Sequence, residues 1–235
     1  MAAEIRGVLV RLVLAAAVLW ALLCGAGYLL IHPLHDTAFE RWDGSVNRQL
    51  AGDRSSFWNT VTHWLTYGAE TVTVVAIGAL FFVGLRLLLG RWRESMFVAA
   101  ALAGEVAIFV LTTLVIDRHR PPVPHLDSAP PTSSFPSGHT AAAVALYAAL
   151  AMIAVRATRR GWLRAIALAV AVLMPLCVAA ARLYRGMHFP TDVMAGAVLA
   201  SVWLAITWAV ILRGHDAGHH KAGFRVRHRG ADGRQ

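Results

Sequence analysis

At 235 residues the chain is long enough for one or two soluble domains, but 57% of its residues are hydrophobic and only 15% are charged. This balance excludes an ordinary soluble enzyme and indicates a membrane protein. The net charge of +9 comes from arginine, because a single lysine stands among the 22 basic residues. No soluble domain is left to carry a nucleic-acid-binding face, so we expect no nucleic-acid partner and assign the charge to the membrane surface.

Apolar runs near the roughly 20 residues that cross a bilayer predict transmembrane helices. The first run reads as an uncleaved signal anchor, since it lacks a clear small-x-small cleavage site. The polar, tryptophan-bearing segment after it is expected to lie at the membrane interface. Six such runs occur, at residues 8–31, 67–89, 95–116, 139–155, 162–181 and 193–212. The sequence therefore predicts an all-α, polytopic bundle of six transmembrane helices.

The predicted bundle forms one domain over residues 1–212, with the chemistry-bearing motifs at about 113–192, and a basic tail follows at 213–235. The tail reads as a disordered, solvated segment attracted to anionic lipids. Three of its histidines lie close together and match no strong metal-ligand spacing: His215, His219 and His220. We therefore predict no metal site there.

The third run carries Glu105 near its middle. An ionisable group at that depth is costly and faces the bundle interior, which makes it a functional candidate. A protonated glutamate hydrogen-bonded to a neighbouring helix explains the residue equally well.

Basic residues divide unevenly between the two sides of the predicted bundle. One side, with both termini and the 2–3 and 4–5 connectors, holds fifteen arginines and lysines, and the other holds seven. The positive-inside rule then places both termini in the cytoplasm. It places the loops at 117–136 and 182–191 together on the outer face, which we assign to a bacterial plasma membrane.

The proline-rich loop at 117–136 has neither periodicity nor apolar length, and a long loop of this kind is often functional. It leads into the FPSGHT stretch at 135–140, where a helix is expected to begin. Ser137 suits an N-cap, Gly138 allows close approach of a ligand, and exposed N–H groups with the helix dipole favour an anion. His139 adds a transferable proton. A plain helix cap is the alternative.

The second informative stretch runs from Arg182 to Asp192. Pro190 suits the first turn of the sixth helix, which puts Asp192 at its head and His188 just before it. A carboxylate on the Nδ1–H of His188 would fix the tautomer and leave Nε2 as a nucleophile or base. Taken alone, two such residues are more often an interfacial hydrogen-bonded pair than a catalytic one.

Several potentially catalytic residues lie in segments that are all predicted on the outer face. Their number favours a catalytic site over a simple helix cap. Two guanidinium groups, a helix N-terminus and two histidines are what phosphoryl transfer without a metal requires. In order, internal spacing and six-helix topology, the segments resemble the three signature motifs of the type 2 phosphatidic acid phosphatase superfamily. These lipid phosphate phosphatases share a site with vanadium haloperoxidases. The resemblance runs from about Trp42 to the sixth helix.

The resemblance implies a role for each matching residue. His188 is the nucleophile that forms a phosphohistidine, Asp192 orients it, and His139 protonates the leaving oxygen and then activates water. No metal or other cofactor is implied. The expected phosphate ligands are the side chains of Arg120 and Arg182 and the backbone N–H groups of Ser137 and Gly138.

Two positions depart from the family pattern. The first motif normally begins with lysine seven residues before its arginine, where this chain has Thr113, and the third begins with serine, where it has Ala181. Loss of a phosphate-binding cation weakens substrate binding or the stabilisation of the transition state. Arg118 or Arg185 could substitute, or could be surface charges at headgroup level. A catalytically weak family member therefore stays open.

The expected substrate is a lipid phosphate within the membrane: a polyprenyl diphosphate or phosphate, phosphatidic acid, or phosphatidylglycerol phosphate. A lipid phosphotransferase using the same phosphohistidine is an alternative. From another class, a transporter or structural membrane protein would use Glu105 to line a path. Membrane lipids are the other expected partners, and the sequence makes no prediction about oligomeric state.

Overall fold

The computed structural model describes residues 2–35, 37–129 and 131–213. In these ranges every regular element is a helix, which confirms the all-α prediction. The predicted basic tail and its histidines lie, beyond Arg213, outside the described residues.

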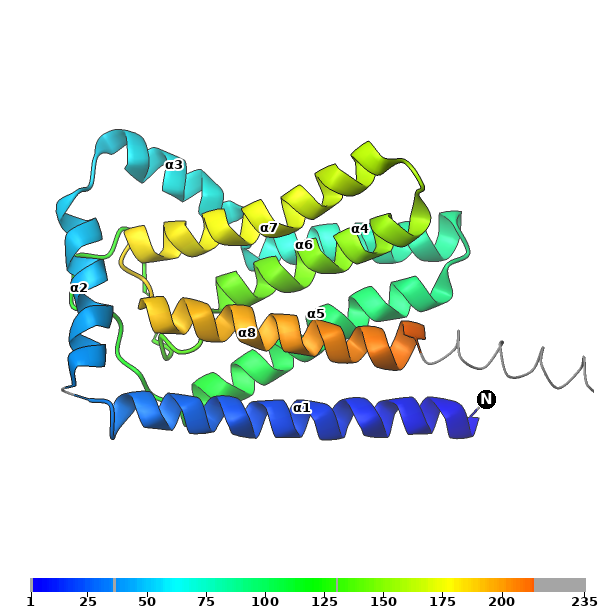
Figure 1. The fold of residues 1–235 in the computed structure, drawn as a ribbon, viewed down its shortest axis with the longest axis horizontal. Helices are drawn as coiled ribbons and strands as arrows, with labels where there is room; N and C mark the ends of the chain where they lie inside the picture. Colours follow the sequence, from blue (N-terminus) through cyan, green and yellow to red (C-terminus); the bar gives the residue numbers. More distant parts are fainter. Residues whose placement is uncertain (1, 36, 130, 214–235) are drawn as a thin grey trace, which may run out of the picture.

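Long apolar helices lie side by side in the bundle (Figure 1). Within the described residues five of them are long and apolar enough to cross a membrane on their own. They are α1 (Ala2–Ile31), α5 (Trp92–Val115), α6 (Gly138–Ala157), α7 (Gly161–Tyr184) and α8 (Pro190–Thr207) with its π-helical end η2 (Trp208–Arg213). The chain is therefore a multi-pass membrane protein.

The predicted second span at 67–89 corresponds to α4 (Thr71–Val83), which continues into the π-helical turn η1 (Gly84–Leu88). It is preceded by α3 (Ser56–Tyr67), which belongs to the segment predicted to lie at the interface. The helices α3 and α4 are bent by 41° relative to each other and count as a sixth span when taken together. The break falls at Gly68, whose carbonyl accepts a hydrogen bond of 2.8 Å from the Tyr147 hydroxyl on α6.

Helix α2 (Ala38–Gly52) lies across one end of the bundle (Figure 1). Together with α3 it forms most of the segment predicted to lie at the membrane interface. Its buried face includes Asp43 and Asn47, and the Asn47 side-chain amide donates to the backbone carbonyl of His188 at 2.9 Å. The helix therefore braces the turn between α7 and α8.

Helix α6 is the centre of the bundle and packs against α5, α7 and α8. Its buried alanines, among them Ala141, Ala145 and Ala149, let neighbouring helices approach closely. At its start, a Cβ on Gly196 of α8 would overlap the Ser137 carbonyl, so the glycine lets the two backbones meet. This close approach brings the second and third predicted motifs together at one end of the bundle.

Candidate active site

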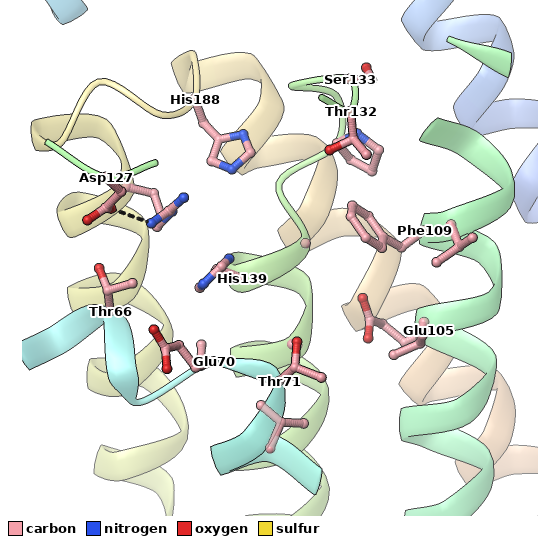
Figure 2. Close-up of a pocket in the computed structure, with 18 of the residues that line it drawn as sticks. Thr66, Glu70, Thr71, Glu105, Phe109, Asp127, Thr132, Ser133, His139 and His188 are labelled. Carbon is pink, nitrogen blue, oxygen red and sulfur yellow. Dashed lines mark hydrogen bonds and ion pairs between the residues drawn. The ribbon is translucent and has the colours of Figure 1, made fainter. Parts of the chain in front are cut away.

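A cavity of about 630 Å³ lies at this end of the bundle, between α3, α4, α5, α6, α7 and the loop before α6 (Figure 2). Its size suits a small-molecule or lipid-headgroup site. The structure brings five of the sequence-predicted site residues to its wall, and they come from all three motifs: Arg120, Gly138, His139, Arg182 and His188. Ser137 and Asp192 are buried behind them.

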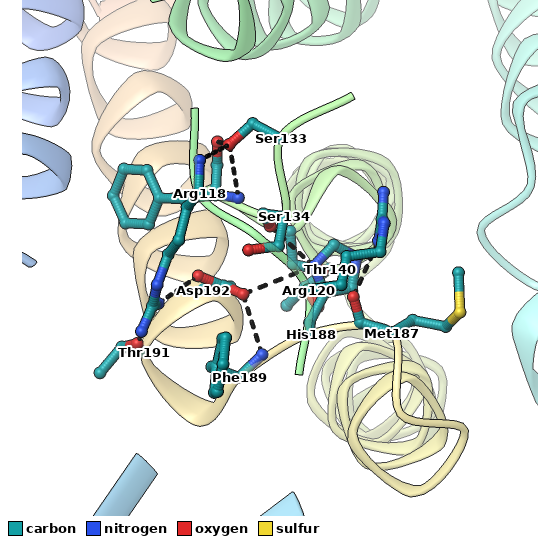
Figure 3. A network of polar contacts seen from close by, with 12 residues as sticks. Arg118, Arg120, Ser133, Ser134, Thr140, Met187, His188, Phe189, Thr191 and Asp192 are labelled. Carbon is teal, nitrogen blue, oxygen red and sulfur yellow. Dashed lines mark hydrogen bonds and ion pairs between the residues drawn. The ribbon is translucent and has the colours of Figure 1, made fainter. Parts of the chain in front are cut away.

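The His188 ring is held by a loop carbonyl. Its side chain is buried, with 4% of the residue exposed, and Nδ1 lies 2.8 Å from the backbone oxygen of Ser134 (Figure 3). A carbonyl can only accept, so in the neutral ring Nδ1 carries the proton and Nε2 keeps its lone pair. Burial lowers the pKa of His188 below its ordinary value of 6.5, although the neighbouring Asp192 opposes the shift. The ring is therefore a neutral nucleophile or base near pH 7.

The expected hydrogen bond from His188 to Asp192 is not formed. Asp192 Oδ2 lies 3.8 Å from Nδ1, which is too long for a hydrogen bond. That oxygen instead accepts from the backbone N–H of Phe189 at 2.9 Å and caps the start of α8, where Pro190 occupies the first turn as predicted. Asp192 thus acts on His188 through its charge and by holding the adjacent backbone.

The backbone N–H of Ser137 is not free for a phosphate, which corrects that prediction. It donates to the backbone carbonyl of Asp192 at 2.9 Å, and the Ser137 hydroxyl is 3.0 Å from the hydroxyl of Thr140. Ser137 occupies the N-cap position but its side chain makes no capping bond. Gly138, the first residue of α6, lines the cavity and remains the backbone candidate for an anion.

Arg118 does not replace the missing phosphate ligand, because its guanidinium is committed elsewhere (Figure 3). It donates to Asp192 Oδ1 at 2.5 Å, to Thr191 Oγ1 at 2.7 Å and to Asp43 Oδ2 at 2.7 Å, and it stacks on the Phe189 ring. Only 8% of the residue is exposed. Arg118 therefore ties α2 to the head of α8.

Arg185 is also a structural residue, so the second suggested substitute fails as well. Its guanidinium donates to both oxygens of Asp127 and to the backbone carbonyls of Leu126 and Asn59. These contacts pin the proline-rich loop to α3 and α7. Arg185 is absent from the residues that line the cavity.

Arg120 and Arg182 are the arginines that face the cavity. One terminal nitrogen of Arg120 donates to the Met187 carbonyl at 2.8 Å, and one of Arg182 pairs with Asp127 at 2.8 Å. The buried Nε of each has no partner among the described residues. Buried donors without acceptors are costly, and phosphoryl oxygens would satisfy them.

Asp127 is a functional candidate that sequence reasoning missed. Its carboxylate lies in the cavity wall and bridges Arg182 and Arg185 (Figure 2). Burial by itself would raise the pKa of Asp127, but the Arg185 hydrogen bond and the two arginine charges hold it below its ordinary value of 3.8. The sequence offered one indication of this role, because Asp127 is the one acidic residue between Asp117 and Asp192.

Other predicted features lie at or beyond the edge of this site. The Thr113 hydroxyl donates to the Val110 carbonyl of its own helix at 2.9 Å, and Thr113 does not line the cavity. Glu105 does line it. In the part of the chain that the structure describes, no group of three or more His, Cys, Asp or Glu side chains is arranged to hold a metal ion.

The chain is similar to known proteins in sequence and in fold. A family model described as the PAP2 superfamily matches residues 94–215. An undecaprenyl-diphosphatase from Sulfolobus acidocaldarius is 30% identical over 139 residues, which cover 59% of this chain and 63% of that relative. The chain thus spans less than two thirds of the relative's length.

A solved structure has the same fold. It is the crystal structure of the first transmembrane PAP2-type phosphatidylglycerolphosphate phosphatase from Bacillus subtilis, with a TM-score of 0.69 and 20% sequence identity. The match covers 87% of this chain and 96% of the other. At that identity the likeness establishes the fold.

Proposed function

Because the chain belongs to the PAP2 superfamily, we propose that it is a membrane phosphatase that hydrolyses a lipid phosphate monoester or diphosphate through a phosphohistidine on His188. One observation carries the proposal. The 2.8 Å contact between His188 Nδ1 and the Ser134 carbonyl leaves the Nε2 lone pair available, in a cavity shared with Arg120 and Arg182.

In the first half-reaction, Nε2 of His188 attacks phosphorus in line with the lipid oxygen. The P–N bond forms as the P–O bond breaks, and a protonated His139 gives its proton to the departing oxygen. The negative phosphate itself favours the imidazolium form of His139. The free donors of Arg120 and Arg182, with the Gly138 N–H, stabilise the equatorial oxygens.

In the second half-reaction the neutral His139 takes a proton from water. The water oxygen attacks phosphorus, the P–N bond breaks, and its electron pair returns to Nε2 of His188. Inorganic phosphate leaves, and both histidines regain their starting states. When a lipid hydroxyl replaces the water, the same steps describe the alternative phosphotransferase.

Several lipids fit the proposal. The two relatives are named for undecaprenyl diphosphate and phosphatidylglycerolphosphate, and phosphatidic acid presents the same phosphate group. A function as a transporter has less support, because Glu105 lines the same cavity as the motif residues.

We also propose that both termini are cytoplasmic and that the cavity opens to the outer face of a bacterial plasma membrane, from the distribution of basic residues. Ser128 is an exposed cavity residue. In a variant with Cys24 and Cys177 replaced by alanine, Ser128→Cys should react with a membrane-impermeant maleimide in intact cells. Reaction only after permeabilisation would reverse the orientation.

The activity is tested by phosphate release from purified protein in detergent, with EDTA present. The substrates are undecaprenyl diphosphate, phosphatidic acid and phosphatidylglycerol phosphate. We expect release that survives EDTA and disappears in His188→Ala, and a ³²P-labelled substrate should leave acid-labile, alkali-stable label on the wild-type chain. Equal release by His188→Ala would refute the phosphohistidine.

A further inference from the structure

Glu105 is a buried acid that the proposed mechanism does not use. It lies on α5 with 1% of the residue exposed, and it lines the cavity, with its carboxyl directed inward (Figure 2). Its Oε2 atom has no hydrogen-bond partner among the described residues. The neighbouring-helix hydrogen bond considered from the sequence is therefore not formed by this oxygen, which remains available to a ligand.

The position of Glu105 along α5 places it just below the phosphate site. Phe109 reaches the start of α6, because a Cβ on Gly138 would lie 2.7 Å from its ring. Glu105 precedes Phe109 by four residues, which puts it about 6 Å deeper along the helix. At that depth a bound lipid would present the linkage between its phosphate and its tails.

Apolar side chains share the cavity with Glu105. They include Val74 and Val75 of α4, Val106 of α5 and Ala142 of α6. A carboxyl without a paired cation in such surroundings stays neutral, because burying an isolated charge costs more than binding a proton. A neutral carboxyl has one O–H to donate, and Oε2 of Glu105 makes no hydrogen bond to any of the described residues.

We propose that Glu105 donates a hydrogen bond to an ester carbonyl of a glycerolipid phosphate, and so selects acylated glycerol phosphates over lipids without a carbonyl group at this depth. The inference rests on the proposed lipid phosphatase function. An ester carbonyl can accept a hydrogen bond but cannot donate one, so it is a suitable partner for the O–H of the neutral carboxyl. A polyprenyl chain carries only hydrocarbon there and leaves Glu105 unpaired.

A matched pair of substrates isolates this contact. Diacyl and dialkyl glycerol phosphates share the headgroup and chain length and differ in the two ester carbonyls. We expect wild-type protein to hydrolyse the diacyl lipid with a kcat/KM about tenfold higher, as one hydrogen bond allows. Glu105→Leu should reduce the ratio to about one, whereas Glu105→Gln, whose amide also donates, should keep it.

Glu70→Gln is the matched control, because Glu70 lines the opposite wall of the same cavity. It should keep the diacyl preference. The inference is overturned if wild-type protein treats the two lipids alike, if Glu105→Leu keeps the preference, or if Glu70→Gln loses it equally.

Binding without turnover separates this inference from the proposed function. Each lipid should raise the thermal midpoint of the full chain, and the diacyl lipid should raise it more in wild type and Glu105→Gln but not in Glu105→Leu. If no lipid releases phosphate yet this pattern appears, the phosphatase proposal fails and Glu105 recognition stands. Equal shifts in all three proteins overturn the recognition.

Discussion

The backbone oxygen of Ser134 lies 2.8 Å from Nδ1 of His188, whereas the nearest carboxylate oxygen of Asp192 lies 3.8 Å away. The loop before α6, and not Asp192, therefore sets the tautomer of His188, the proposed nucleophile. That loop is itself anchored, because the Ser134 N–H donates to the Arg118 carbonyl at 2.9 Å and the Ser134 hydroxyl to the His119 carbonyl at 3.0 Å. The first motif thus positions the nucleophile of the third.

Asp192→Asn should lower kcat by about 10–100-fold, less than the roughly 10⁴-fold loss expected when an acid fixes the tautomer directly. The variant removes a negative charge beside the histidine but leaves the Ser134 contact in place. It also weakens the buried pair with Arg118, so the free energy of unfolding should fall by about 1–3 kcal/mol. Steady-state kinetics and thermal denaturation measure the two effects.

Asp43→Asn is the control for that variant, since Asp43 pairs with the same arginine from α2. It should destabilise the protein to a similar extent while kcat per folded molecule stays unchanged. If both variants lower kcat equally, Asp192 acts on the site only through the Arg118 network.

The acid limb of the kcat/KM profile should have its midpoint below pH 6.5. Burial lowers the pKa of His188 from that ordinary value, so the ring stays neutral and nucleophilic at pH values where a free imidazole is already half protonated. Activity is lost only as pH falls through the depressed value. The profile must be corrected for ionisation of the substrate phosphate, measured separately by ³¹P NMR. A corrected midpoint above 6.5 would contradict the assignment.

Asp127→Asn should tighten inhibition by inorganic phosphate about 3–10-fold. The carboxylate competes with phosphate for Arg182, and its removal frees that guanidinium and removes a negative charge from the cavity. Asp117→Asn, an exposed acid at the start of the same loop, should leave the inhibition constant unchanged. Weaker inhibition in Asp127→Asn would mean that Asp127 positions Arg182 and does not compete with the anion.

Thr113→Lys should raise kcat/KM for a lipid phosphate by about tenfold. Thr113 follows the cavity residues Phe109 and Val110 by about one helical turn on α5, so a lysine stem can carry its ammonium to the cavity mouth. A charged hydrogen bond to a phosphoryl oxygen is worth about that factor. Thr113→Met, with a similar stem and no charge, should not reproduce the gain. An unchanged kcat/KM in the lysine variant would mean that Arg120 and Arg182 already supply the required charge.

Local sequence was enough to predict the long apolar helices and five of the residues that line the cavity. Apolar length located five spans, and the motif spacing identified His139, His188, Arg120 and Arg182. The second span was predicted at 67–89, but the sequence did not show that α3 joins it through a bend at Gly68, because the Tyr147 contact at the bend comes from α6. A hydropathy pattern contains no information about a contact with a residue so far away in the sequence.

The availability of each arginine was decided by tertiary structure. In sequence, Arg118, Arg120, Arg182 and Arg185 carry the same chemistry at similar places in two loops. In the fold, Asp43 from α2 and Asp127 from the middle of the proline-rich loop neutralise Arg118 and Arg185, while Arg120 and Arg182 keep free donors at the cavity. A guanidinium binds whichever acceptors surround it, and those acceptors come from segments far apart in the chain. Spacing along the chain therefore determines which groups approach the site, and three-dimensional pairing determines which of them remain free to bind phosphate.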